Sequence, residues 1–119
     1  MDPKMSQTNY PSSEHVLCDI DGRGVATVTL NRPDVHNAFD DVLIAALTET
    51  FTRLDSDNTV RAVVLASTGK SFCAGADLNW MKRMASYSYE QNLNDANALA
   101  TMLHTFNTLS KPTIARVQG

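Results

Sequence analysis

The sequence has few cysteines, no long apolar run and no excess of positive charge. Its two cysteines, Cys18 and Cys73, lie far apart without CxxC spacing, and the N-terminus does not resemble a secretion signal. Both features predict a reducing, cytoplasmic setting. No apolar run approaches the ~20 residues needed to span a bilayer. We therefore expect a soluble protein that makes no membrane contacts.

The charge balance and the histidines exclude further classes of protein. A formal net charge of −3 gives no general attraction to phosphate backbones, so we expect no nucleic-acid partner. His15, His36 and His104 show no metal-ligand spacing, and we expect no metal. The absence of a GxGxxG or P-loop pattern argues against a generic nucleotide-binding domain. A chain of 119 residues that is 43% hydrophobic and 19% charged is typical of one globular domain or part of one.

The first residues of the chain predict a leader followed by a hairpin. Residues 1–13 are polar, contain two prolines and show no periodicity, so we interpret them as a flexible leader. The alternating segments 15–21 and 25–30 flank the turn Gly22-Arg23-Gly24 and predict two paired strands.

A helix and a buried strand are predicted next. Asp40 or Asp41 can cap the helix, and the polar residues 55–58 end it. The unbroken apolar run 62–66 is typical of a strand covered on both faces. The buried stripe of the helix is predicted to comprise Leu43, Leu47, Phe51 and Leu54.

The last third of the chain predicts two helices and a strand. Asp77 is the natural N-cap of a short helix over 78–84, and Ser88 with Gln91 has capping-box spacing for a second helix that stops at Lys111-Pro112. A strand is predicted over 113–118, and the whole pattern is α/β. The buried stripe of the second helix is predicted to comprise Leu93, Ala96, Leu99, Leu103 and Phe106.

The segment 72–78 has the features of a site. A strand end, small side chains at Ala74, Gly75 and Ala76, and a capped helix start together expose backbone N–H groups toward one point. A ligand carbonyl oxygen could accept a hydrogen bond there, as in an oxyanion hole. Small residues before a helix are also compatible with tight packing alone. The loop 31–38 between a strand and a helix is a second place where α/β folds contact ligands.

Several short motifs follow one another along the chain: Thr29-Leu30-Asn31-Arg32-Pro33, Asn37-Ala38, Ala62-Val63-Val64-Leu65, Phe72-Cys73-Ala74-Gly75-Ala76-Asp77-Leu78, Lys111-Pro112-Thr113-Ile114-Ala115 and Gly119. Taken in this order, they resemble the crotonase (enoyl-CoA hydratase/isomerase) superfamily from about residue 16 to 119. The resemblance implies a crotonase-like ββα spiral fold, of which residues 14–119 would be the N-terminal portion of a truncated acyl-CoA-binding domain. Residues 76–82 look most like bacterial methylglutaconyl-CoA hydratases.

The resemblance also implies a mechanism and a site. Family members stabilise the enolate of an acyl thioester with two backbone N–H donors, and the first would be that of Ala76. Ala74 and Leu78 would line the thioester channel, with Val35 to Ala38 against the coenzyme A nucleotide. The second donor and the catalytic glutamates would lie beyond Gly119. The substrate-binding residues implied are Val35, Ala38, Ala74, Gly75, Ala76, Asp77 and Leu78.

Several relatives place lysines after the proline and after the Ala-Asp-Leu segment to contact coenzyme A phosphates, whereas this sequence has Asp34 and Asn79. Arg32, Lys70 and Lys82 are either substitutes or solvated surface charges.

Four other residues near these segments have structural interpretations. Cys73 is interpreted as buried filler rather than a nucleophile. Trp80 and Met81 are interpreted as packing rather than acyl contacts. Asp77 is expected to act as the helix cap rather than as a catalytic carboxylate.

The expected function is hydration of an α,β-unsaturated, branched enoyl-CoA such as methylglutaconyl-CoA. Coenzyme A would arrive as part of the substrate, with no separate cofactor. Another crotonase activity, such as enoyl-CoA isomerisation, and a catalytically inert CoA-binding or assembly fragment are the alternatives. By resemblance the full-length protein would form a homo-oligomer, a trimer or hexamer. The 119-residue chain alone is expected to be nearly inert and marginally stable.

Overall fold

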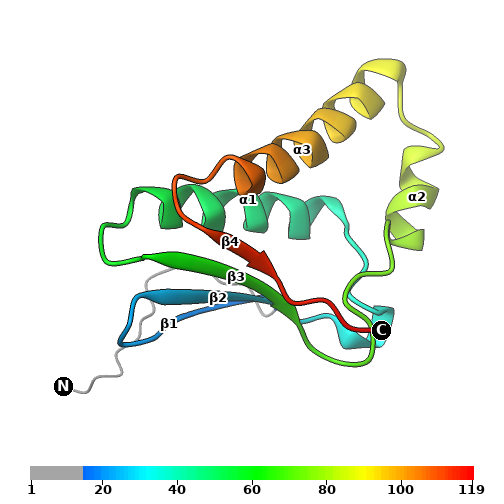
Figure 1. Ribbon diagram of the computed structural model, residues 1–119. Helices are drawn as coiled ribbons and strands as arrows, with labels where there is room; N and C mark the ends of the chain where they lie inside the picture. Colours follow the sequence, from blue (N-terminus) through cyan, green and yellow to red (C-terminus); the bar gives the residue numbers. More distant parts are fainter. Residues whose placement is uncertain (1–14) are drawn as a thin grey trace.

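The computed structural model describes residues 15–119, and Figure 1 shows their arrangement. The predicted leader, residues 1–13, lies outside the described part. The elements in chain order are β1 (Val16–Ile20), β2 (Val25–Leu30), the short 3-10 helix η1 (Pro33–Val35), α1 (Asp41–Ser56), β3 (Ala62–Ser67), α2 (Leu78–Met84), α3 (Tyr89–Asn107) and β4 (Thr113–Ala115).

The strands form one mixed sheet in the order β1-β2-β3-β4. The predicted hairpin is confirmed, because β1 pairs with β2 in antiparallel register with Cys18 opposite Val28. The pairs β2–β3 and β3–β4 are parallel, with Val28 opposite Leu65. The parallel pairs place the loops that follow β2 and β3 at the same end of the sheet.

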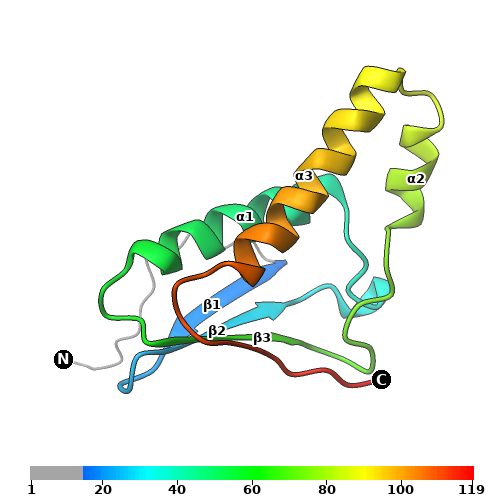
Figure 2. The same ribbon diagram turned by 45° about the horizontal axis from the view of Figure 1, so that its top comes forward.

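Helix α1 covers one face of this sheet, as Figures 1 and 2 show. Asp40 is its N-cap and accepts a hydrogen bond from the Leu43 N–H at 2.8 Å. The predicted stripe is confirmed, since Leu43, Leu47, Phe51 and Leu54 are all buried. Helix α3 packs on α1, with the rings of Phe51 and Phe106 4.9 Å apart.

The predicted stripe on α3 is partly wrong. Leu93 and Leu103 are 44% and 53% exposed, whereas Met102 is only 2% exposed. Ala96 is exposed as well. The predicted Leu99 and Phe106 do pack on the core, together with Met102, which was not predicted. The predicted face and the observed one both have helical spacing. Contact with α1 therefore selects between them.

The strands β3 and β4 differ from the sequence-based expectation in two ways. In β3, Val63 and Ala66 are buried but Val64 and Leu65 are half-buried, so the strand is less completely covered than its unbroken apolar run predicted. β4 ends at Ala115 rather than at residue 118. The chain then turns toward the loop after β3, where the Gln118 side chain donates to the carbonyl oxygen of Gly69 at 3.1 Å.

Helix α2 stands apart from the other helices, at the end of the sheet where β2 and β3 finish (Figures 1 and 2). Trp80 attaches it to α3, because its indole Nε1 donates to Asp95 Oδ2 at 3.1 Å. None of the helices over residues 15–119 is long and apolar enough to cross a bilayer.

Candidate functional site

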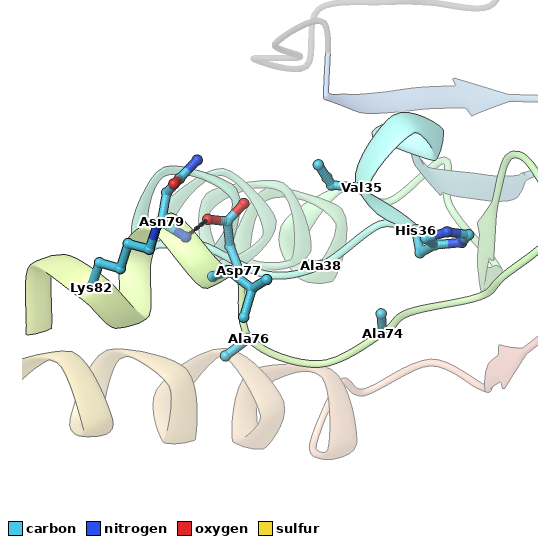
Figure 3. Close-up of a pocket in the computed structure, with 9 residues that line it drawn as sticks. Val35, His36, Ala38, Ala74, Ala76, Asp77, Asn79 and Lys82 are labelled. Carbon is cyan, nitrogen blue, oxygen red and sulfur yellow. Dashed lines mark hydrogen bonds between the residues drawn. The ribbon is translucent and has the colours of Figure 1, made fainter.

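A pocket of about 480 Å³ opens between α2 and the loops that follow β2 and β3. Figure 3 shows its lining. It contains all the predicted substrate-binding residues except Gly75. His36, Asn79 and Lys82 also line it. His36 belongs to the segment expected against the coenzyme A nucleotide and Lys82 was a candidate phosphate contact, whereas Asn79 was not a predicted binding residue. The predicted residues that line it are Val35, Ala38, Ala74, Ala76, Asp77 and Leu78.

The backbone of Ala76 is held in a single parallel β-bridge with Phe39. The Phe39 N–H donates to the Gly75 carbonyl oxygen, and the Asp77 N–H donates to the Phe39 carbonyl oxygen, both at 2.7 Å. Successive residues of an extended segment direct their N–H groups to opposite sides, so the Ala76 N–H points away from Phe39. Within residues 15–119 no protein group accepts a hydrogen bond from it.

Small residues leave room around this free donor. Ala74, Gly75 and Ala76 are all exposed. Gly75 adopts a φ of +105°, and a Cβ added there would meet nothing within 4 Å. The left-handed conformation, rather than a lack of space, therefore favours glycine at this position. A ligand carbonyl oxygen can approach the backbone here.

Asp77 is the N-cap of α2, as predicted. Its Oδ1 accepts from the backbone N–H groups of Asn79 at 2.7 Å and Trp80 at 3.1 Å, and its Oδ2 accepts from Arg32 Nη2 at 2.9 Å. The hydrogen bond from the Trp80 N–H, followed by the Arg32 guanidinium and the Asn79 N–H, holds the pKa of the Asp77 carboxyl below its ordinary value. The carboxylate is thus ionised and engaged by donors of the protein.

The loop that carries Val35 and Ala38 is fixed by Asn37, whose side chain is completely buried. Asn37 Oδ1 accepts from the Arg32 N–H at 2.7 Å, while Nδ2 donates to the carbonyl oxygens of Thr68 at 2.8 Å and Ser71 at 2.9 Å. The two bonds from Nδ2 join the loop after β2 to the loop after β3, and the bond from the Arg32 N–H holds the first of these loops in shape. They bring the two lining segments of the pocket together.

The residues suggested as phosphate contacts have different environments. Arg32 is only 13% exposed in its side chain and is bonded within the protein, so the suggestion that it substitutes for a phosphate-binding lysine is wrong. Lys70 is exposed and does not line the pocket. Lys82 lines it together with His36 and Asn79. Lys82, His36 and Asn79 lie close in sequence to predicted site residues, and this was the signal that could have placed them at the pocket. The sequence pattern alone did not show which way their side chains face.

The cysteine and the two large apolar residues near the site have structural environments. Cys73 is partly buried and packs on the core, which agrees with its interpretation as filler. Trp80 is buried in the core as predicted. Met81 is 48% exposed, so its interpretation as a packing residue is wrong. Neither Trp80 nor Met81 lines the pocket.

An exposed backbone N–H lies at the mouth of an apolar-lined pocket, and a β-bridge and a capped helix fix its direction. This arrangement defines a protein that can polarise the carbonyl group of a ligand. The enoyl-CoA hydratase/isomerase family matches residues 21–119, and the chain belongs to that family. This confirms the resemblance to the crotonase superfamily and the crotonase-like fold.

Individual relatives support the same assignment. The chain is 38% identical over 95 residues to a putative enoyl-CoA hydratase of Thermus thermophilus, covering 80% of this chain and 38% of the relative. It is 42% identical over 66 residues to the 1,2-epoxyphenylacetyl-CoA isomerase of Escherichia coli, covering 56% of this chain and 25% of the relative. A crystal structure of an enoyl-CoA hydratase from Shewanella pealeana superposes with a TM-score of 0.85 and 42% identity, covering 88% of this chain and 39% of that one. The chain thus spans about two fifths, or less, of the length of these relatives.

Proposed function

We propose that the pocket binds the thioester of an acyl-CoA and that the Ala76 N–H is one donor of its oxyanion hole. The observation that carries the proposal is the Ala76 backbone, held in its bridge to Phe39 with its N–H unpartnered beside the pocket. Ala74 and Leu78 then flank the thioester, and the segment from Val35 to Ala38 with Gly75 and Asp77 completes the binding surface.

The proposed reaction of the complete protein is hydration of an α,β-unsaturated, branched enoyl-CoA such as methylglutaconyl-CoA. Water adds to the β-carbon, negative charge develops on the thioester oxygen, and a proton then adds to the α-carbon. A preorganised N–H donor aimed at that oxygen contributes about 2.7–4 kcal/mol to the transition state. The support is the likeness of residues 76–82 to methylglutaconyl-CoA hydratases and a relative named as a putative enoyl-CoA hydratase. Coenzyme A enters as part of the substrate, with no further cofactor.

The 119-residue chain by itself is proposed to bind acyl-CoA without turnover. Asp77 is the carboxylate among the residues lining the pocket, and its oxygens already accept from Arg32, Asn79 and Trp80. These bonds hold its pKa below the ordinary value, which makes it a weak general base. Loss of acid/base groups removes about 10²- to 10⁴-fold in rate, and loss of a second oxyanion donor would add to that.

Two alternatives use the same site. The complete protein could isomerise an enoyl-CoA, which membership of the enoyl-CoA hydratase/isomerase family favours, or the chain could serve as an inert CoA-binding fragment. We further propose a homo-oligomeric full-length form, a trimer or hexamer, and a cytoplasmic location. The free thiols of Cys18 and Cys73 fit a reducing compartment.

Binding and turnover are tested together. Crotonyl-CoA and 3-methylglutaconyl-CoA are titrated into the ¹⁵N-labelled chain, and hydration is followed in parallel. We expect the Ala76 amide resonance to shift and no product to form. Ala74→Phe, which fills the pocket, should weaken binding at least about tenfold, while Ala100→Phe on the exposed side of α3 should not. An unmoved Ala76 resonance would sink the proposed site. Product at enzyme-like rates would show that the catalytic groups lie within this chain.

A further inference from the structure

One arginine connects the N-caps of two helices. Arg32 Nη2 lies 2.9 Å from Asp77 Oδ2, the cap of α2, and Nη1 lies 3.5 Å from Asp40 Oδ2, the cap of α1. Nη1 also donates to the Ala38 carbonyl oxygen at 2.7 Å. The side chains of Arg32, Asp40 and Asp77 are 13%, 18% and 8% exposed. One guanidinium group therefore connects the starts of α1 and α2 beside the pocket.

This junction lies directly beside the bridge that aims Ala76. Phe39 lies between Ala38, whose carbonyl oxygen accepts from Arg32, and Asp40, which pairs with it. On the other side of the bridge, Asp77 pairs with Arg32 and donates its own N–H to the Phe39 carbonyl oxygen. Both backbone hydrogen bonds that hold Ala76 are thus adjacent to groups that Arg32 contacts.

We propose that Arg32 is a positioning residue that sets the direction of the Ala76 N–H by clamping residues 38–40 against Asp77. The inference rests on the proposed role of Ala76 as an oxyanion donor. Arg32 itself does not touch the ligand, since it is not among the residues that line the pocket. Its planar fork reaches a carbonyl and two carboxylates at once, which the single ammonium of a lysine cannot do with the same geometry.

Burial gives the clamp its strength. Charge-assisted hydrogen bonds that are largely shielded from water contribute more than exposed ion pairs. Helix α2 carries an exposed pair for comparison, because Arg83 Nη2 lies 3.0 Å from Asp41 Oδ1 with side chains that are 50% and 42% exposed. The Arg83–Asp41 pair connects α2 to the start of α1 directly, and Arg32 connects the caps of the same two helices through its pairs with Asp77 and Asp40. Only the Arg32 pair adjoins the bridge.

The test measures hydrogen exchange of the Phe39 amide in the 119-residue chain by NMR. Its N–H donates to the Gly75 carbonyl oxygen, so its exchange reports opening of the bridge. Arg32→Gln should accelerate this exchange about 10- to 100-fold relative to amides of strand β2, because a hydrogen bond to a charged group is lost. Asp77→Asn, which keeps a cap acceptor but removes the charge, should act in the same direction if Arg32→Gln does not fold. Arg83→Gln should leave the ratio unchanged.

A crotonyl-CoA titration separates this inference from the proposed function. In the wild type the Ala76 amide should shift on binding, and in Arg32→Gln the shift should fall well below that in Arg83→Gln. If Phe39 and β2 amides accelerate equally, or if Phe39 does not respond, Arg32 is not a positioning residue. If the wild-type Ala76 amide does not shift while Phe39 exchange still depends on Arg32, the clamp stands as a structural device and the acyl-CoA site fails.

Discussion

Asn37 is the residue whose loss should do the most local damage. Its side chain makes three part-buried hydrogen bonds, and its φ of +57° is a conformation that asparagine tolerates better than alanine. Asn37→Ala removes the partner of the Arg32 N–H and of the Thr68 carbonyl oxygen, and it leaves the Ser71 carbonyl oxygen with the 3.4 Å hydrogen bond from Ser67 Oγ. We expect a loss of about 3 kcal/mol in the free energy of unfolding, measured by urea denaturation.

Two further variants separate the causes of this loss. Asn37→Gly removes the same hydrogen bonds but tolerates a positive φ, so it should be less destabilising than Asn37→Ala by about 1 kcal/mol. Asn94→Ala, on the exposed surface of α3, should stay within about 0.5 kcal/mol of the wild type. Equal stability of Asn37→Ala and Asn94→Ala would show that the Asn37 hydrogen bonds between the two loops contribute nothing to the free energy of unfolding.

Asp77 should make stability depend on acid pH. Its pKa is lowered in the folded chain below the ordinary value of 3.8, so the unfolded chain binds the proton more readily. The stabilisation is fully present above the unfolded pKa and is lost as pH falls through the folded pKa. Asp77→Asn should be less stable than the wild type by about 1–3 kcal/mol at pH 7, and the gap should close below pH 4. Urea unfolding midpoints of both proteins from pH 7 to pH 3 measure this difference in stability. A difference that does not change with pH would contradict the lowered pKa of Asp77.

Residues close together in sequence were the predictable part of the site. Ala74, Ala76, Asp77 and Leu78 belong to one continuous segment, so their meeting at one pocket follows from a strand end and a helix start. The role of Arg32 was not predictable, because Asp77 lies 45 positions away along the chain. A long charged side chain can reach solvent or a buried partner, and only the packed loops decide which.

Met102 and Leu103 on α3 provide a test at the scale of the element. Met102 is 2% exposed and packs on the core, whereas Leu103 is 53% exposed. Met102→Ala should cost about 2–4 kcal/mol of unfolding free energy, since it leaves a cavity under α3. Leu103→Ala should cost less than about 0.5 kcal/mol. Thermal or urea unfolding of both variants measures the two losses in stability. A larger loss of unfolding free energy for Leu103→Ala would support the buried face of α3 that was predicted from the sequence.

The elements themselves were more predictable than their faces. Caps at Asp40, Asp77 and Ser88 and the stop at Lys111-Pro112 are local signals, and the helices begin and end near them. The buried face of α3 and the end of β4 depend on partners elsewhere. Lys111 shows the same dependence, because its Nζ donates to the Leu54 carbonyl oxygen at the end of α1. No pattern around Lys111 indicates that contact.

At the scale of the whole molecule, the sheet is covered unequally. Helix α1 packs on one face of it (Figure 2), where Ala26, Val28 and Leu30 are buried. β4 is the last strand of the order, so within residues 15–119 its outer edge has no strand partner. Ile114 and Val117, in and after β4, are 57% and 67% exposed. An unpaired edge with exposed apolar side chains is a template for pairing between chains.

We therefore expect the 119-residue chain to self-associate as its concentration rises, with a broad thermal transition. Ile114→Lys places a charge on the open edge strand and should raise the monomer fraction, because a lysine there opposes pairing with another edge. Val42→Lys adds the same charge at a 61% exposed position on α1, away from the edge, and should have little effect. Sedimentation velocity over a range of concentrations measures all three proteins. A wild-type chain that stays monomeric with a sharp cooperative transition would contradict the prediction, and equal effects of the two lysines would place the contact elsewhere than β4.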